Sequence, residues 1–124
     1  MTAREMIEAV VEAVNDSGTL PVVAALDFLD DKAPAASVQQ LSGSRWLERY
    51  IDGGGVTEVP FAVWLRVPSR DTESRLNAAE ALYDLIDALE DSELDVVGTD
   101  TPTLEVRDKD GELWRVTVAV RFEQ

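Results

Sequence analysis

Two stretches of the sequence alternate apolar with polar or small side chains, and this pattern constrains the fold more than any other feature of the chain. The first stretch covers Val59–Val67 and the second covers Trp114–Phe122. Successive side chains of a β-strand point to opposite sides of a sheet, so a period of two predicts two strands, each with one face on a core. The side chains predicted to face the core are Phe61, Val63, Leu65, Val67, Trp114, Val116, Val118, Val120 and Phe122.

Turn residues predict that each of these strands belongs to a hairpin. Gly53, Gly54 and Gly55 follow an expected strand over Ser44–Ile51, and glycine adopts a positive φ at little steric cost. The second turn, Asp108–Gly111, joins "TLEVR" to "ELWRVTVAVRF" and has the Asp and Gly residues of a tight connection. We therefore expect two antiparallel hairpins.

Two other segments have the residue spacing of amphipathic helices. They are expected over about Ala3–Val14 and about Thr72–Glu90. In the second helix, the predicted buried stripe is Leu76, Ala79, Tyr83, Ile86 and Leu89, and the predicted exposed residues are Glu73, Glu80, Asp84, Asp87 and Glu90. Leu20–Leu29 is apolar and fits either a strand or a helix, whereas Asp30–Gln40, which contains Pro34, is predicted to be a connecting loop.

The expected fold is a single α+β domain over residues 1–124. It consists of a mainly antiparallel sheet of about four strands, arranged as two hairpins, with the helices packed on one face. A chain of 124 residues, 45% of them hydrophobic, is long and apolar enough to bury such a core.

Charge and missing residue types narrow the function classes. The chain contains 25 Asp and Glu against 11 Lys and Arg, a formal net charge of -14, and such a surface repels nucleic acid and anionic membranes. A high-salt habitat gives a similar composition. The absence of cysteine and histidine removes disulfides, thiolate sites and the commonest general base and zinc ligand. No apolar run is long enough to span a membrane and "MTAREMIEAV" lacks the features of a signal peptide, so we expect a protein made in the cytoplasm and used without export.

Three segments have a superficial likeness to chemical sites. The acidic pairs Asp30–Asp31 and Asp108–Asp110 fall in predicted loops, where carboxylates are normally solvated. "DKDGE", Asp108–Glu112, begins like a calcium loop but lacks the distant bidentate Glu. Gly53–Gly55 lacks the helix N-terminus and the lysine of a phosphate loop. We expect no catalytic, metal or cofactor site, and no enzyme activity.

Large aromatic and arginine side chains, which are typical of buried protein contacts, occur on the strand face that points away from the predicted core. Trp64 and Arg66 share this face of the first alternating strand. The alternative is that Trp64 is covered by Leu20–Leu29 of its own chain. The candidate subunit-interface residues are Trp64, Arg66, Arg115, Arg121, Trp46 and Tyr50, the last two from the strand that enters the first hairpin.

The segment "YIDGGGVTEVPFAVWLR" resembles the hairpin motif of tail terminator proteins of long-tailed bacteriophages, also described as minor capsid or tail-completion proteins. The motif residues are Tyr50, Asp52, Gly53, Gly54 and Phe61, and a second aromatic is present only as Trp64, at a wider spacing. In that family the hairpin precedes a helix similar to "DTESRLNAAEALYDLIDALE" and a final aromatic strand similar to "GELWRVTVAVRFEQ". The resemblance covers about Leu41–Gln124.

By this resemblance the protein is a structural virion protein rather than an enzyme. Family members assemble as a ring, commonly a homohexamer, at the head-tail junction. The ring caps the tail tube, contacts the tail-tube protein and the head-tail connector or stopper protein, and lets DNA pass through its lumen without specific binding. A closed ring needs a head-to-tail interface, and an acidic lumen repels phosphate. Two other interpretations stay open: an acidic protein-interaction module, such as a small DNA-mimicking or inhibitory dimer, and a small enzyme that works without His or Cys.

Overall fold

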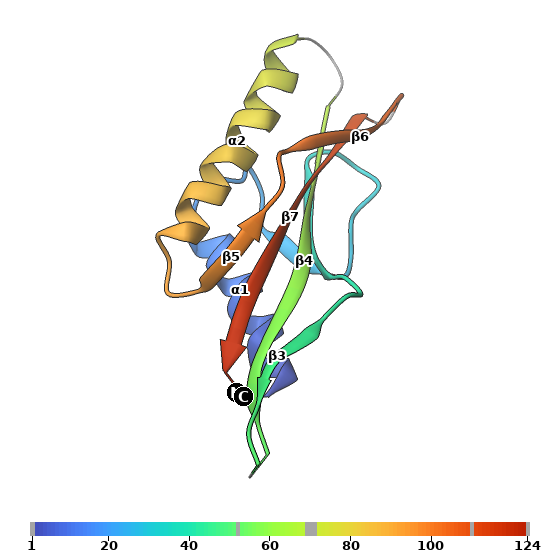
Figure 1. Cartoon of the computed structure of the whole chain (residues 1–124). Helices are drawn as coiled ribbons and strands as arrows, with labels where there is room; N and C mark the ends of the chain where they lie inside the picture. Colours follow the sequence, from blue (N-terminus) through green and yellow to red (C-terminus); the bar gives the residue numbers. More distant parts are fainter. Residues whose placement is uncertain (1, 52, 69–71, 110, 124) are drawn as a thin grey trace.

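Two helices and seven strands form an α+β fold within the residues that the structure describes. The structure is a computed structural model, and it describes residues 2–51, 53–68, 72–109 and 111–123. In chain order the elements are α1 (Ala3–Asp16), β1 (Ala24–Leu26), β2 (Ala35–Gln40), β3 (Arg45–Arg49), β4 (Gly55–Val67), α2 (Thr72–Glu90), β5 (Asp95–Thr99), β6 (Thr103–Asp108) and β7 (Gly111–Glu123). Figure 1 shows an elongated molecule with the β3–β4 hairpin at one end.

The sheet is built around two long strands, β4 and β7. Its order is β1-β2-β4-β7-β5, with β3 also paired with β4 and β6 also paired with β7. β4 and β7 pair antiparallel from Val56 opposite Glu123 to Val67 opposite Glu112. β1 and β2 pair in parallel, which makes the sheet mixed. The α+β class is therefore confirmed, whereas the expected sheet of four antiparallel strands is too simple.

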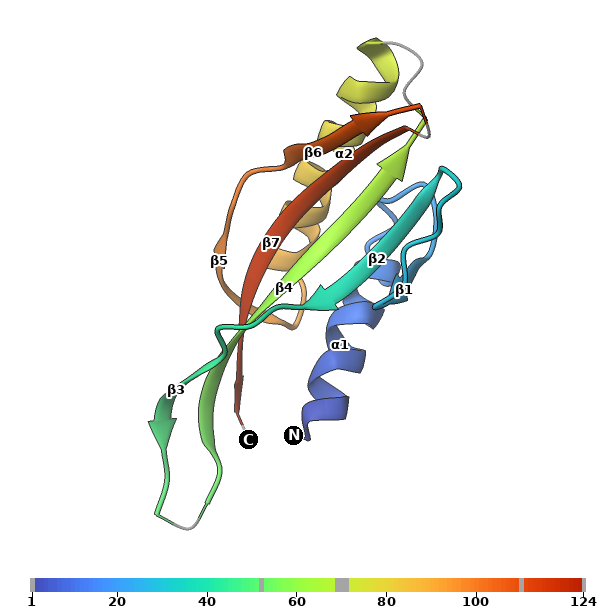
Figure 2. The same ribbon diagram turned by 90° about the vertical axis from the view of Figure 1, so that its right-hand side faces the viewer.

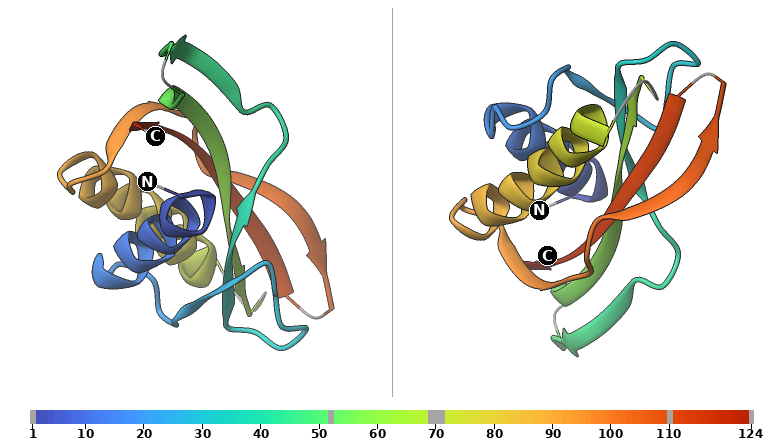
Figure 3. Two further views of the ribbon diagram at one scale, coloured as in Figure 1. Left: turned by 90° about the horizontal axis from the view of Figure 1, so that it is seen from below. Right: turned by 90° about the horizontal axis from the view of Figure 1, so that it is seen from above.

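The core lies between the sheet and the two helices, which cover the same face (Figure 3). The side chains that the alternation predicted to face the core are buried, among them Phe61, Val118 and Phe122. The helices contribute Met6, Val10 and Val14 from α1 and Ala78, Leu82, Leu85, Ile86 and Leu89 from α2. α1 starts with a capping box, in which the Thr2 hydroxyl accepts from the Glu5 N–H at 3.2 Å and the Glu5 carboxylate accepts from the Thr2 N–H at 3.4 Å.

The prediction of a loop over Asp30–Gln40 was wrong, because its second half is β2. Ala35–Val38 is buried along its whole length between β1 and β4. Small residues have weak strand propensity, but pairing on both sides and coverage on both faces override it. Leu20–Leu29, for which a strand and a helix were both open, contains the short strand β1. β5 was not expected, and it pairs with the free side of β7.

The predicted buried stripe of α2 was partly wrong, because the helix is rotated relative to the prediction. Leu76 is 62% exposed and Tyr83 is 51% exposed. Ala78, Leu82 and Leu85 lie against the sheet instead. The predicted and the observed buried stripes both have helical spacing. The observed stripe buries more leucine side chains and leaves the hydroxyl of Tyr83 in water, where it needs no protein partner.

Gly55 is expected to be required for the β3–β4 hairpin. Its φ is +145°, and a Cβ at this position would overlap the carbonyl oxygen of Glu48. We expect Gly55→Ala to lower the free energy of unfolding by about 1–3 kcal/mol, because the strands must separate to admit the methyl group. Urea denaturation followed by circular dichroism measures the loss.

Gly98→Ala is the matched control for this change. Gly98 lies in β5 with an ordinary φ, and no atom lies within 4 Å of an added Cβ. Its substitution should change stability by less than about 0.5 kcal/mol. Equal effects of the two alanines would contradict a steric role for Gly55.

Candidate functional site

The sheet face away from the helices brings together several of the predicted interface residues. The register places Trp64 of β4 opposite Arg115 of β7 and opposite Ser37 of β2. The Arg115 guanidinium lies 5.6 Å from the centroid of the Trp64 ring, and its Nη2 lies 2.9 Å from a Glu105 carboxylate oxygen. The Trp64 indole N–H donates to Gln39 Oε1 at 3.0 Å. Trp64 is therefore half-buried within a polar network of its own chain.

Arg66 and Arg121 lie on this same face but make separate contacts. Arg66 Nε donates to the backbone carbonyl of Asp30 at 3.2 Å, from the segment between β1 and β2. Arg121 lies farther along β7, opposite Glu58, and its Nε is 3.9 Å from Asp95. We call the face that carries Trp64, Arg66, Arg115 and Arg121 the open sheet face. Each of these side chains already contacts a partner within the chain.

Trp46 does not lie on the open sheet face, and Tyr50 follows the end of β3, away from Trp64 and Arg115. Trp46 pairs with Thr57, whose side chain lies on the helix-covered side of β4. A β-bulge between Trp46 and Glu48 shifts the register of β3, so alternation does not continue through the strand. Trp46 and Tyr50 belong to the β3–β4 hairpin, which extends beyond the rest of the molecule (Figure 2).

This hairpin carries a group of exposed side chains at its outer end. We call them the hairpin tip: Trp46, Leu47, Arg49, Tyr50 and Ile51. Trp46, Leu47 and Tyr50 are 41%, 40% and 39% exposed, and Ile51 is fully exposed. The Arg49 guanidinium lies over the Trp46 ring, 4.6 Å from its centroid. Leu47 and Ile51 were not among the predicted interface residues. The signal was that large apolar side chains occur at both odd and even positions of this short segment, which indicates apolar surface on both faces of the strand.

The glycine motif forms the turn of this hairpin, as predicted. Gly53 and Gly54 have φ of +94° and +72°, and the Gly53 N–H donates to the Tyr50 carbonyl at 3.2 Å. Asp52 of the motif lies outside the described residues. Phe61 is far from the turn along β4 and is buried in the core. The turn joins two strands rather than opening a helix, so it does not present the amides of a phosphate loop.

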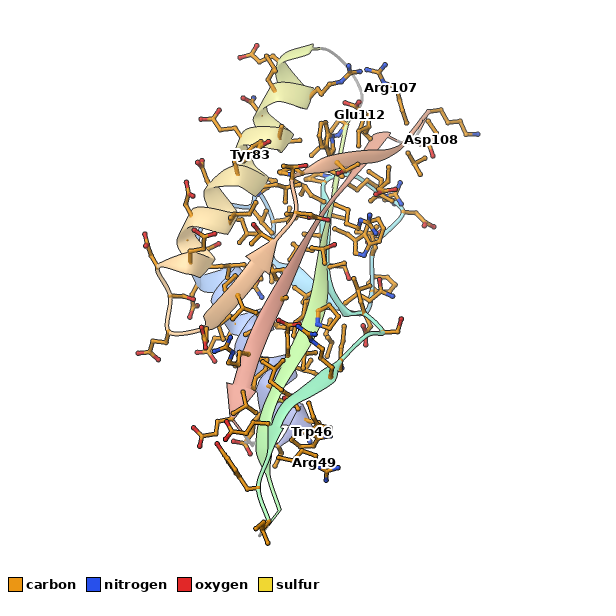
Figure 4. The ribbon with its side chains drawn as sticks, viewed as in Figure 1. Trp46, Arg49, Tyr83, Arg107, Asp108 and Glu112 are labelled. Carbon is orange, nitrogen blue, oxygen red and sulfur yellow. The ribbon has the colours of Figure 1, made fainter. Side chains whose placement is uncertain are left out.

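A row of acidic side chains follows the outward face of α2. It runs between Glu73 and Glu90 and includes the two apolar residues that the sequence analysis placed in the core. We call it the outer α2 stripe, and its exposed members are Glu73, Leu76, Glu80, Tyr83, Asp84, Asp87 and Glu90. The acidic members were predicted to be exposed, and this is confirmed. Figure 4 labels Tyr83 on this helix.

A buried carboxylate, Glu112, joins three elements. Its Oε2 accepts from Arg75 Nε of α2 at 3.1 Å and lies 3.3 Å from Arg107 Nε of β6 (Figure 4). Its Oε1 has no hydrogen-bond partner among the described residues. Glu112 was considered only as part of "DKDGE". Glu112 precedes Trp114 by two residues and so lies on the same face of β7 as the core residues. This spacing, which indicates that its side chain points inward, was missed.

The other carboxylates singled out from the sequence do not form a cluster. Asp30 Oδ1 accepts from the Lys32 N–H at 3.0 Å in the segment between β1 and β2, Asp108 ends β6, and Asp110 lies outside the described residues. Across the ranges that the structure describes, no group of three or more His, Cys, Asp or Glu side chains is placed to hold a metal ion. In the same ranges no helix has the length and apolar character needed to cross a membrane.

A cavity of about 560 Å³ lies between α2 and residues 18–21. Its described lining is mostly apolar and includes Leu20, Leu65, Val67 and Ala81, with no Asp, Glu, Lys or Arg among these residues. General acid–base catalysis needs a titratable group within hydrogen-bond reach of the substrate, and this lining offers none. Three surfaces expose large apolar, arginine or acidic side chains: the hairpin tip, the open sheet face and the outer α2 stripe.

Comparison with protein-family models and with curated proteins finds no match to this chain.

Proposed function

We propose that this protein is a ring-forming structural component of a bacteriophage virion, of the tail terminator type. The resemblance over Leu41–Gln124 supports the proposal, and so does the placement of the motif residues, since the glycines form a hairpin turn and Phe61 anchors β4 in the core. Such a ring would cap the tail tube and would contact the tail-tube protein and the connector. DNA would pass through it.

The hairpin tip is the observation that carries this proposal. Ile51 is fully exposed and Trp46 and Leu47 are about 40% exposed, and all three belong to the protruding β3–β4 hairpin. Exposed apolar side chains gathered in one place mark protein contact sites, and Trp, Tyr and Arg are enriched where such contacts are strongest. In a ring the tip would contact a different surface of the next copy, because closed rings are built from heterologous interfaces.

The net charge of -14 fits a ring through which DNA moves. A wall of like charge repels phosphate and does not hold the genome in place. The arginines of the open sheet face then remain candidates for a second subunit contact, although each one now has a partner within the chain.

Native mass spectrometry over a concentration series tests the proposal, with negative-stain images of the same samples. We expect closed rings of one stoichiometry, six copies if the family resemblance holds. Ile51→Ser should weaken ring formation by about tenfold or more, because a buried aliphatic side chain contributes about 1.5–3 kcal/mol. Val23→Ser is the matched control, since Val23 is also exposed but lies before β1, away from the tip. A chain that stays monomeric at every concentration would overturn the proposal.

An acidic interaction module is the second candidate, and the row of carboxylates on the outer α2 stripe favours it. Such a protein would bind a basic DNA-binding protein, and added DNA would compete for that partner. The stripe also exposes Leu76 and Tyr83, which imitation of a phosphate backbone does not require. A competition assay with DNA separates this candidate from the ring.

A further inference from the structure

β1 is the terminal strand of the sheet, and no strand of the described ranges pairs with its outer edge. The Asp27 N–H donates to the Val38 carbonyl at 2.9 Å, so the backbone of Asp27 is directed at β2. Backbone groups alternate in direction along a strand, which turns those of Ala24 and Leu26 toward the outer edge. This edge is the place where a further strand would pair.

The side chain of Asn15 occupies this edge at Ala24. Asn15 lies in the last turn of α1, beside β1 (Figure 2). Its Oδ1 accepts from the Ala24 N–H at 2.8 Å, and its Nδ2 donates to the Ala24 carbonyl at 3.2 Å. An amide group that bonds both backbone groups of one residue makes the same pair of hydrogen bonds as a neighbouring strand. The Asn15 side chain therefore takes the place of a strand.

The composition of β1 makes an open edge here prone to association. An exposed apolar edge strand is a template for pairing with another chain, and proteins often protect such edges with charges or bulges. β5, at the other end of the sheet order, has Asp95 and a β-bulge between Val96 and Gly98. The three residues of β1, Ala-Ala-Leu, carry no charge and pair with β2 without a register shift. Protection of this edge must come from elsewhere in the chain.

We propose that Asn15 is an edge cap, which keeps a second copy of the chain from extending the sheet at β1. Without the cap, the backbone groups of Ala24 and Leu26 would pair with the same edge of another molecule, since two identical edges form an antiparallel pair about a two-fold axis. The exposed side chains of Val23 and Phe28 flank this edge and would add apolar contact area. The cap acts within one subunit, so it operates whether or not the subunits form a ring.

Hydrogen exchange of the Ala24 amide, followed by NMR, tests the cap in Asn15→Ala. At low protein concentration, this amide should exchange at least about tenfold faster than in the wild-type chain, because the N–H has lost its acceptor. At high concentration its protection should return, since the edge of a second copy supplies a new acceptor. Light scattering should then give a larger mean mass for the variant than for the wild-type chain at the same concentration, which separates this contact from any ring.

Further variants separate capping from a general loss of structure. Asp16→Ala changes the next residue, which is exposed in the same turn of α1, and should leave the Ala24 exchange rate and the mass unchanged. Leu26→Lys added to Asn15→Ala should return the mass to the wild-type value, because a charge on the edge opposes pairing. If Asn15→Ala does not fold, Asn15→Ser replaces it, since a serine side chain is too short to bond both groups of Ala24.

Three results would contradict the edge cap. An Ala24 exchange rate in Asn15→Ala equal to that of the wild-type chain would show that Asn15 does not close the edge. Fast exchange without a gain in mass at any concentration would leave Asn15 as a link between α1 and β1 only. A gain in mass that persists with Leu26→Lys, or that Asp16→Ala reproduces, would place the association on another surface.

Discussion

Phe61→Ala is expected to lower the free energy of unfolding by about 3–5 kcal/mol. Phe61 lies in the middle of β4 and is fully buried between the sheet and the helices. Its ring packs edge-to-face on Phe122 of β7, with centroids 6.5 Å apart and an interplanar angle of 75°. Removing the ring leaves a cavity in the central strand, where β4 and β7 cannot collapse without disturbing their long register. Urea denaturation followed by circular dichroism measures the change.

Tyr83→Ala provides the control for loss of an aromatic ring. Tyr83 is 51% exposed on α2, so the change in stability should stay within about 0.5 kcal/mol. A loss below about 1 kcal/mol for Phe61→Ala would contradict its place in the core.

The two central strands and the long helix could be predicted because each one has a regular apolar spacing over most of its length. β4 and β7 alternate over most of their 13 residues, so Trp64 and Arg115 are assigned to the outer face even before their pairing is known. α2 begins and ends where the spacing predicted, at Thr72 and Glu90. In all three elements the signal comes from many residues that agree.

β2 and β5 were missed because their structure depends on neighbours distant in the sequence. Apart from Val38, β2 consists of small and polar residues, and it is a strand because β1 and β4 pair with its two edges. β5 has only two half-buried valines and depends on the free edge of β7. Patterns within a segment do not report such pairing, since strand propensity depends mainly on context.

The candidate site was predictable for the open sheet face and not for the hairpin tip. Trp64, Arg66 and Arg115 follow the alternation of their strands, and the structure places them on one face. The bulge in β3 moves Trp46 to the other side of the sheet, and a bulge leaves no clear mark in a five-residue strand. The exposure of Leu76 and Tyr83 depended on which of two helical stripes faced the core, and only the packing of α2 on the sheet decided it.

The second large effect is expected when Glu112 loses both of its cationic partners. Its carboxylate is fully buried, and Arg75 and Arg107 both approach Oε2. Arg75→Met combined with Arg107→Met should lower the free energy of unfolding by about 3–5 kcal/mol, because an ionised carboxylate would remain buried without a compensating charge. Chemical denaturation of the double variant at neutral pH measures the loss.

Adding Glu112→Leu to the double variant should restore most of the lost stability, since a buried ion cluster replaced by apolar side chains is often neutral or stabilising. The triple variant separates the charge from the packing. If the free energy of unfolding of the double variant falls by less than about 1 kcal/mol, water reaches the carboxylate and the ion pairs contribute little to stability. If the triple variant is as unstable as the double variant, the arginine stems, not the charges, hold α2 to the β6–β7 hairpin.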